Sequence, residues 1–368
     1  MLGSAPVARV RPFRAVRYDE RKAGPLAALI APPYDVISPE ERKRYLARSP
    51  HNVVHLTLPD DEADAARMWA EWLAEGALVR DEESALWWLA QDYVGPDGIA
   101  RSRGGLVCSL RVEPYDVGVV LPHERTHAGP KEGRLRLLRS LRAHVEPIFL
   151  LYEGSLRGPG GEPLLDVELD GVRNRLWRVE GDPPEALADA RLLIADGHHR
   201  YETALAFHDE GGSEESAWLM VVVVPTEQEG LTIFPTHRIA RRMPRAYAIH
   251  GLHVPEGVGA ALRRLDELPR ERAAAVLYRP RHAVILDGEE GQLDTALVDE
   301  IGPEGVTYTP SLEEATAAVD SGEAEAAFLL RPPTIEQVRT VAERGETMPQ
   351  KSTYFYPKLP SGFVFHPL

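Results

Sequence analysis

Residues 192–207 have the sequence LLIADGHHRYETALAF, in which an apolar strand is expected to run directly into a helix. The first four residues are apolar, Asp196-Gly197 is a tight-turn pair, and apolar residues recur at helical spacing from Tyr201 onward. The first amides of a helix have no partner within the helix and lie at the positive end of its dipole. This strand–helix junction is therefore predicted to bind an anion such as a phosphate group.

The polar side chains of the junction fit phosphate chemistry. Arg200 offers a planar fork that can bind phosphate through two parallel hydrogen bonds. His198 and His199 can donate hydrogen bonds or transfer protons, and Asp196 can cap the helix or hold a divalent metal ion. The plainer interpretation is a capped helix with surface histidines, but capping alone does not require so many adjacent functional side chains.

Composition excludes several classes of protein. The 368 residues include 42 basic and 57 acidic side chains, so the formal charge is 42 − 57 = −15, and such a chain is a poor general binder of nucleic acid or anionic membranes. Cys108 is the only cysteine, which excludes an internal disulfide and a multi-cysteine metal site. The longest apolar run, Trp218 to Val224, is far shorter than the roughly 20 residues of a membrane span. We therefore expect a cytoplasmic protein that binds neither nucleic acid nor membrane.

The pattern along the chain predicts an α/β protein of mixed α+β type. A capping box at Ser38 and Glu41 predicts the start of one helix, and residues 61–75 form a second, amphipathic one. Apolar strands are expected at 104–112 and 148–152, among others, and strands and helices alternate again in the C-terminal part of the chain.

Two short polar segments outside the junction are also candidates for a site. Residues 32–35, Pro-Pro-Tyr-Asp, place a carboxylate on a stiff loop, which can hold it at the hydroxyl distance that phosphoryl transfer demands. Residues 351–353, Lys-Ser-Thr, set a cation beside two hydroxyls, and this lysine is one of only five in the chain. The plainer interpretations are a helix-entry turn for the first segment and a tail anchored by aromatic residues for the second.

The motif His123-Glu124-x-x-His127 matches the zinc-binding pattern of metallopeptidases, in which both histidines lie on one helix. Pro122 and the Gly-Pro pair at 129–130 leave barely one helical turn for them, although Glu146 is a possible third ligand. A zinc hydrolase is therefore a less favoured alternative. An active-site loop, in which residues 123–126 meet a nucleotide or a metal ion, is favoured over an ordinary polar loop.

Five motifs together resemble a bacterial conserved family known as domain of unknown function 1015, from about Arg11 to the C-terminus. They are APPYDVI at 31–37, LPHERTHAGPKEGR at 121–134, DGHHRYETA at 196–204, FPTHR at 234–238 and MPQKSTYFYPKLPSG at 348–362. The DGHHR turn is also similar to the phosphate-binding turn of the ParB/sulfiredoxin superfamily, and in particular to that of free-serine kinases. Sulfiredoxin itself is excluded because its turn carries a cysteine where this chain has His198.

The resemblance implies a ParB/sulfiredoxin-like nucleotide-binding core with a large insertion and an additional α/β lobe. The core would comprise residues 1–60 and 150–249, and residues 61–149 would form an inserted helix and sheet region. Residues 250–345 would form the second lobe, and residues 346–368 would form a tail that packs on the site.

For function, the resemblance implies a kinase that depends on ATP or ADP and on Mg²⁺ and that phosphorylates the hydroxyl of free L-serine to O-phosphoserine. The alternative is a ParB-like nucleotide-hydrolysing regulatory or binding module; the oligomeric state is left open. The kinases' catalytic glutamate maps onto no position here, so Glu124 or Asp35 is the expected base, with His123 also in the catalytic group. The nucleotide is assigned to Asp196, Gly197, His198, His199 and Arg200, the metal ion to Asp196, and the substrate to Tyr34, Asp35, Lys351, Ser352 and Thr353.

Overall fold

The computed structural model describes residues 7–126, 128–188, 190–244 and 251–368, and the chain divides into two units. The first unit contains the chain up to Leu231 together with Pro357–Leu368, and the second unit contains Thr232–Tyr356. The predicted mixed α/β class is confirmed. In the described ranges no helix has both the length and the apolar character needed to cross a membrane.

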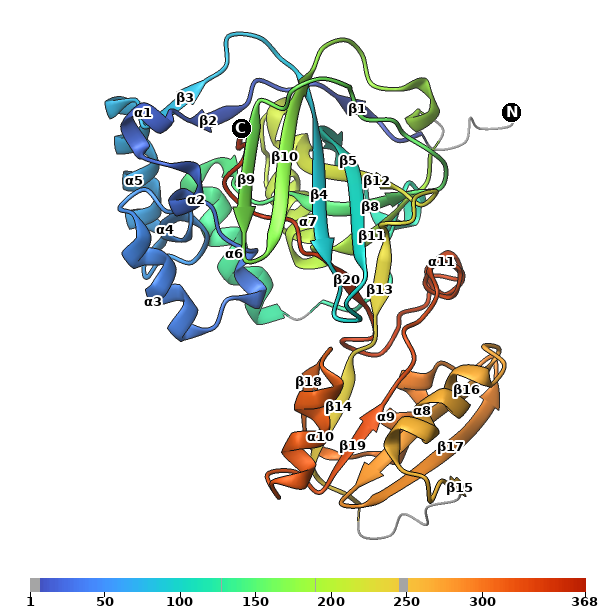
Figure 1. The fold of residues 1–368 in the computed structure, drawn as a ribbon. Coiled ribbons are helices and arrows are strands. Elements are labelled where there is room, and N and C mark those ends of the chain that lie inside the picture. Colours follow the sequence, from blue (N-terminus) through green and yellow to red (C-terminus); the bar gives the residue numbers. More distant parts are fainter. Residues whose placement is uncertain (1–6, 127, 189, 245–250) are drawn as a thin grey trace, which may run out of the picture. The chain divides into compact units, whose positions relative to one another are not determined.

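A mixed sheet, nine-stranded in the described part of the chain, forms the framework of the first unit (Figure 1). Its most central strand, β12, is buried throughout because its continuous apolar sequence leaves it no polar face. β12 pairs in parallel with β8 and antiparallel with β5, while β11 pairs antiparallel with β8 and in parallel with β6. The strands in spatial order are β6 (Val120–Leu121), β11 (Leu192–Asp196), β8 (Ile148–Tyr152), β12 (Trp218–Pro225), β5 (Ala100–Arg111), β4 (Leu86–Val94), β10 (Val172–Val179) and β9 (Leu165–Leu169), with β1 (Val10–Arg11) paired to β5.

Two of the longer helices of the first unit begin at capping residues that can be recognised in their sequences. Ser38 and Glu41 form the predicted capping box at the start of α3, and the Asp61 carboxylate caps α5. Helices α1 to α5 cluster beside the sheet in Figure 1, and α6 packs against both α5 and α7. The α-helices are α1 (Glu20–Ala23), α2 (Leu26–Leu29), α3 (Pro39–Arg48), α4 (Val54–Thr57), α5 (Glu62–Glu75), α6 (Ala128–Leu141) and α7 (His198–Asp209). The short 3-10 turns are η1 (Tyr34–Val36), η2 (Tyr115–Val117), η3 (Glu185–Leu187) and η4 (Glu214–Ala217). Two further pairs of strands are β2 (Val16–Tyr18) with β3 (Leu78–Arg80) and β7 (Ala143–His144) with β21 (His366–Pro367).

The second unit is built on an antiparallel sheet with helices on both faces. Apolar residues of α8 and α10 pack on one face, and those of α9 pack on the other. The sheet has the order β15 (Gly251–His253), β17 (His282–Glu290), β16 (Arg272–Arg279), β19 (Ala326–Leu329), β14 (His237–Arg242) and β18 (Glu304–Thr309). The helices are α8 (Val258–Glu267), α9 (Asp294–Ile301), α10 (Leu312–Asp320) and α11 (Ile335–Glu343). Where the chain enters and leaves this unit, β13 (Thr232–Phe234) pairs antiparallel with β20 (Tyr354–Tyr356).

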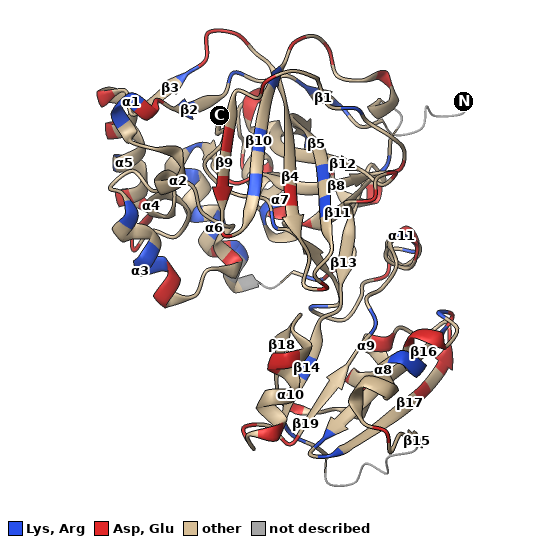
Figure 2. Ribbon diagram, in the orientation of Figure 1, with Lys and Arg blue, Asp and Glu red and all other residues tan. Residues whose placement is uncertain are grey.

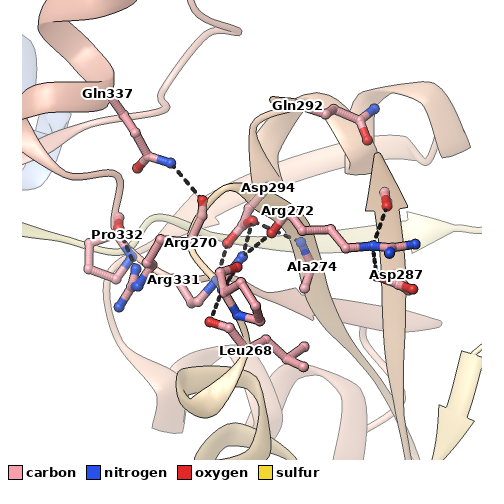
Figure 3. Close-up of polar contacts among 12 residues, drawn as sticks. Leu268, Arg270, Arg272, Ala274, Asp287, Gln292, Asp294, Arg331, Pro332 and Gln337 are labelled. Carbon is pink, nitrogen blue, oxygen red and sulfur yellow. Dashed lines mark hydrogen bonds and ion pairs between the residues drawn. The ribbon is translucent and has the colours of Figure 1, made fainter. Parts of the chain in front are cut away.

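A buried ion pair between Arg331 and Asp294 links several connecting segments of the second unit (Figure 3). The Arg331 side chain is 2% exposed and binds Asp294 through both Nε and a terminal nitrogen, at 2.8 and 2.7 Å. Its remaining donors bind the carbonyls of Leu268, Pro269 and Arg272 at 2.8–3.2 Å. Because every donor of the guanidinium has a partner, Arg331 fixes the turn between α8 and β16 to the start of α9.

The observed unit boundaries differ from the expected ones. The second unit begins at Thr232 and ends at Tyr356, not at residues 250 and 345, because β13, β14 and β20 pair within it. Residues 61–149 do not form a separate insertion, since they supply β4 and β5 to the middle of the main sheet. The expected tail, residues 346–368, is divided between the two units. Apart from the local pairing of β4 with β5, these pairings join residues far apart in sequence, and the amino-acid composition does not indicate them.

A helix follows closely after the loop at residues 123–126. α6 begins at Ala128, and Pro130 lies in its first turn, where the missing N–H removes no helical hydrogen bond. His123 to Thr126 precede this helix. The zinc-binding pattern of metallopeptidases requires both histidines to lie on one helix, and His123 does not lie on a helix. His127 lies outside the described residues.

Two buried histidines pack together where β21 meets β7. The rings of His144 and His366 are stacked with centroids 5.9 Å apart, and Phe13 lies edge-on to His366 at 4.8 Å. Burial lowers the pKa of His144 to about 4, and burial together with the neighbouring His144, Arg11 and Arg80 lowers the pKa of His366 to about 3. Both rings are therefore neutral in the folded protein at neutral pH.

These histidines predict a loss of stability on mild acidification. In the unfolded chain each ring binds a proton near pH 6.5, so the unfolded state takes up more protons as pH falls from about 6.5 toward 4. The neutral rings therefore contribute their full stabilisation above about pH 6.5, and this contribution declines as pH falls toward 4. His366→Phe removes one of these rings. The number of protons that the chain takes up on unfolding between pH 6 and 4.5 should therefore fall by about one, and urea unfolding measures this as a smaller change of unfolding free energy with pH. Equal slopes for the variant and the wild type would contradict this.

Candidate functional site

The predicted strand–helix junction is confirmed at the end of β11. The strand ends at Asp196, and α7 begins at His198. Gly197 lies between them with a φ of 101°, in the left-handed region that glycine tolerates. A Cβ at this position would lie 3.2 Å from the Arg200 guanidinium and from Ile148, so a larger residue would crowd the turn. Glycine has no side chain to cap the helix, and the first turn of α7 is therefore suited to an external anion.

Asp196 lies between two cations. One oxygen pairs with Arg200 at 2.6 Å, and the other pairs with the ammonium group of Lys358, which follows Asp196 by 162 residues. Burial disfavours ionisation of the Asp196 side chain, which is 13% exposed, but Lys358 and Arg200 together hold its pKa well below the usual range. Asp196 is therefore a carboxylate, with one positive charge on each side.

A third cation adds to the positive charge near this carboxylate. Basic positions are visible on β5 in the middle of the main sheet (Figure 2), and one of them is the fully buried Arg103. Burial lowers the pKa of Arg103 to about 10, and the charge of Asp196 acts in the opposite direction. Arg103 is still cationic at neutral pH, so three cations, Arg103, Arg200 and Lys358, lie near the carboxylate of Asp196.

Arg200 connects the junction to the loop with Tyr34 and Asp35. Its guanidinium also donates to the Pro147 carbonyl. Burial disfavours the charged form, yet Asp196, then Glu146 and Asp35, raise the pKa of Arg200 above its ordinary value. Asp35 is therefore close enough to Arg200 for its charge to act on it, although Asp35 itself is exposed.

Glu146 holds the Tyr34 loop in place. One carboxylate oxygen accepts from the Tyr34 backbone N–H at 2.9 Å, and the other pairs with Arg134 at 3.0 Å. The Arg134 guanidinium in turn lies 4.0 Å from the centre of the Tyr34 ring. Because burial raises the pKa of the Tyr34 hydroxyl, this residue is a neutral aromatic wall at neutral pH. The expected substrate residues Tyr34 and Asp35 are thus placed beside Arg200.

His123 and His198 are both buried and take part in hydrogen bonds within the protein. The backbone N–H of His123 donates to Nε2 of His198 at 3.2 Å, and Nδ1 of His123 donates to the Ile194 carbonyl at 2.7 Å. Burial lowers the pKa of His123 to about 4 and that of His198 well below 6.5. His123 is 1% exposed, and a part for it in catalysis stays a prediction. Its contacts hold the backbone next to Glu124 beside the start of α7.

A second charged group lies one turn further along α7. Glu202 accepts from the Thr126 hydroxyl at 2.7 Å and from Lys131 of α6 at 3.0 Å. These bonds tie the residues that follow Glu124 to the helix that carries Arg200, and the contact of His123 with His198 ties the residue before Glu124 to the same helix. The backbone of Glu124 is thus fixed near the junction from both ends.

The expected substrate residues of the tail lie in the second unit. Ser352 is 3% exposed, and its hydroxyl donates to the Pro349 carbonyl and contacts the Thr295 hydroxyl. These contacts hold the turn in which Lys351 has a φ of 55°. Binding of substrate by Lys351, Ser352 and Thr353 stays a prediction.

A small pocket that is open to solvent adjoins Glu146 and Arg200. Arg134, Glu146, Arg200 and Thr203 provide its polar lining, and apolar residues of α6 such as Leu138 provide much of the rest. A few convergent polar groups at one side of an apolar pocket are typical of small-molecule sites.

Sequence analysis missed several of these residues. Lys358, Arg103, Arg134 and Glu202 were not among the candidates, and Glu146 was considered only as a zinc ligand. Among the described residues no group of three or more His, Cys, Asp or Glu side chains is arranged to hold a metal ion. A signal was available for Lys358 alone, since it is one of five lysines and lies between two prolines.

The fold is that of a mixed α/β protein, and its candidate site is the strand–helix junction at Gly197. The sequence profile of the family described as protein of unknown function, DUF1015, matches residues 10–252, and the chain belongs to this family. The family suggested by the five motifs is thereby confirmed, although the last motif, at 348–362, lies beyond the matched range.

None of the curated proteins matches the sequence. Among solved structures, a free serine kinase in complex with AMP has 18% identity and a TM-score of 0.40, over 67% of this chain and 89% of that one. A conserved hypothetical protein from Pyrococcus furiosus has 17% identity and a TM-score of 0.37, over 66% and 90%. SbnI with C-terminal truncation from Staphylococcus aureus has 12% identity and a TM-score of 0.37, over 70% and 81%.

Proposed function

We propose that this protein is a phosphotransferase that moves a phosphoryl group from ATP or ADP to the hydroxyl of a small molecule, with free L-serine as the first acceptor to test. The observation that supports this most is the junction at Gly197, an uncapped helix start beside Arg200, Lys358 and Arg103. Cations beside a helix start without a side-chain cap suit the phosphates of a nucleotide, because phosphoryl transfer depends mainly on positioning and neutralising charge.

The residues of the site are proposed to have the following roles. The first amides of α7 and the Arg200 fork bind phosphate oxygens. Asp35 and Glu124 are the candidate bases, since one is exposed near Arg200 and the other is held beside the start of α7. The base takes the proton of the acceptor hydroxyl as its oxygen attacks phosphorus and the nucleotide oxygen leaves. Tyr34 and the pocket beside Arg134 are proposed to contact the acceptor.

Magnesium would supply further neutralisation of the phosphates if it arrives with the nucleotide. In this structure both oxygens of Asp196 pair with cations, so Asp196 can hold a metal ion only if Lys358 leaves it. No role given above to Asp35, Glu124, Arg200 or the α7 amides requires Asp196 to be a metal ligand.

The proposal is tested by incubating the full chain with ATP or ADP and each hydroxyl amino acid, followed by direct detection of the phosphorylated product by ³¹P nuclear magnetic resonance and mass spectrometry. Formation of O-phosphoserine would support it. Nucleotide hydrolysis that is independent of any acceptor would favour the ParB-like module instead, and an acceptor other than serine would correct the substrate alone.

Arg200→Ala is expected to weaken nucleotide binding about 30- to 150-fold, or by about 2–3 kcal/mol, because a charge-assisted bidentate pair with phosphate would be lost. Isothermal titration calorimetry with ATP and ADP measures this. Arg139→Ala is the matched control, since Arg139 is a half-exposed arginine on α6 that pairs with Glu210. Unchanged affinity in a folded Arg200→Ala protein would contradict the assignment.

A further inference from the structure

The buried carboxylate of Glu146, which is 5% exposed, has partners in three separate segments of the first unit. One oxygen accepts from the Tyr34 backbone N–H at 2.9 Å and from the Ser361 hydroxyl at 3.3 Å. The other oxygen pairs with Arg134 at 3.0 Å. These partners belong to the loop at residues 32–35, to the C-terminal segment and to α6. The carboxylate therefore joins segments that are far apart in sequence.

The loop at residues 32–35 is held at two points. Ala31, just before it, exchanges two backbone hydrogen bonds with Ser361, at 2.8 and 3.3 Å. Glu146 then holds the backbone of Tyr34, and the Arg134 guanidinium lies 4.0 Å from the centre of the Tyr34 ring. Asp35 is the next residue, and it is exposed. The position of the Asp35 side chain therefore depends on a backbone that Glu146 fixes.

Glu146 also lies close to the Gly197 junction. Burial disfavours the charged form of Arg200, whereas Asp196, then Glu146 and Asp35, raise its pKa. Arg134, Glu146 and Arg200 line the same small pocket. The contacts of Glu146 thus set the distance between the exposed carboxylate of the loop and the arginine that is proposed to bind phosphate.

Stability alone is a poor explanation for this buried carboxylate. An ion pair such as that of Glu146 with Arg134 contributes little net stability, because the cost of desolvating both charges offsets most of their attraction. A buried polar network in which each member has a partner does, however, specify one arrangement of the groups that it joins. The arrangement specified here is that of the loop before Asp35.

We propose that Glu146 is a positioning residue of the candidate site. It holds the loop at residues 32–35 so that Tyr34 and Asp35 meet the acceptor beside Arg200, and it does not itself contact the reacting atoms. This inference rests on the proposed function, because it concerns the acceptor of the same reaction. It deepens that function by separating an acceptor side, set by Glu146, from the nucleotide side at Gly197.

The variant Glu146→Gln tests the proposal, since the amide keeps the size of the side chain and removes its charge. The value of kcat/KM for the acceptor should fall about 10- to 100-fold, because a small displacement of positioned groups costs much of the rate. ATP affinity, measured calorimetrically, should not weaken, because loss of a negative charge near Arg200 leaves its positive charge available to phosphate. A merely structural role would lower the free energy of unfolding and leave the kinetic constants of the folded protein unchanged.

Ser361→Ala is a second variant that leaves the buried ion pair intact. It removes one uncharged donor to the same carboxylate, so kcat/KM for the acceptor should fall about 2- to 10-fold, again without loss of ATP affinity. Glu62→Gln is the matched control. It breaks an ion pair of 2.9 Å with Arg136, which lies on α6 as Arg134 does, and both constants should stay at wild-type values.

The outcomes separate this inference from the proposed function. Wild-type acceptor kinetics in a folded Glu146→Gln protein, or in Ser361→Ala where Glu146→Gln does not fold, would overturn the role of Glu146 and leave the kinase proposal intact. An equal loss of ATP affinity would also overturn it, because the effect would not be confined to the acceptor. If the wild type phosphorylates no acceptor, the proposed function is wrong and this inference is wrong with it.

Discussion

Replacing the catalytic base by its amide should lower kcat by about 10²–10⁴-fold while nucleotide affinity stays close to that of the wild type. Asp35→Asn and Glu124→Gln are the two variants, and one of them is expected to show this loss. An amide keeps the size of the side chain but cannot accept the hydroxyl proton. Because neither residue belongs to the Gly197 junction, calorimetric binding of ATP or ADP should change little.

Steady-state kinetics of phosphoserine formation, with calorimetry on the same preparations, measure both quantities. Glu40→Gln is the matched control, since Glu40 is an exposed carboxylate in the first turn of α3, close in sequence to Asp35. If both Asp35→Asn and Glu124→Gln retain full turnover, the mechanism as proposed is wrong. A loss that appears only in KM would instead assign the residue to substrate binding.

Arg331→Leu should destabilise the second unit by about 3–5 kcal/mol, because it leaves the Asp294 carboxylate without its buried partner. Three carbonyls of the turn between α8 and β16 would also lose their donor. The tryptophans lie outside the second unit, so fluorescence does not report on it. Native-state hydrogen exchange of the β16 amides, residues 272–279, is the appropriate measurement.

The structure supplies a control for this variant within the same turn. Arg272 pairs with Asp287 at 2.6 Å, but both side chains are 56% exposed (Figure 3). Arg272→Leu should therefore change the exchange free energy of β16 by about 0–1 kcal/mol. Similar effects of the two substitutions would show that burial does not determine the strength of the Arg331 pair.

The junction at Gly197 could be predicted from sequence because all its determinants are local. An apolar strand, a turn glycine and a helical repeat occupy sixteen consecutive residues, and each follows from the preferences of its own segment. The capping boxes at Ser38 and at Thr334 were visible for the same reason. The aromatic strand β4 was not predicted, although its first residues form an apolar run like those of β8 and β11.

The partners of the junction could not be predicted, because they arrive through long-range pairing. Lys358 is separated from Asp196 by 162 residues, and the Tyr34 backbone is separated from Glu146 by 112. The scarcity of lysine directed attention to Lys131 and Lys351. Lys131 does bind Glu202, but the lysine that reaches Asp196 was the neighbouring Lys358. Rarity alone does not indicate which cation the fold brings to the carboxylate.

The ladder of β13 with β20 has a consequence for how this chain could have been assembled. Thr232 and Tyr356 are paired neighbours, so the 125 residues of the second unit leave and rejoin the chain at one place. A segment whose ends are adjacent can be gained, lost or exchanged as a block, because the host polypeptide needs only a short link across the gap. A chain with a different block at this position, or with a direct connection, would still contain the Gly197 junction and residues 357–368.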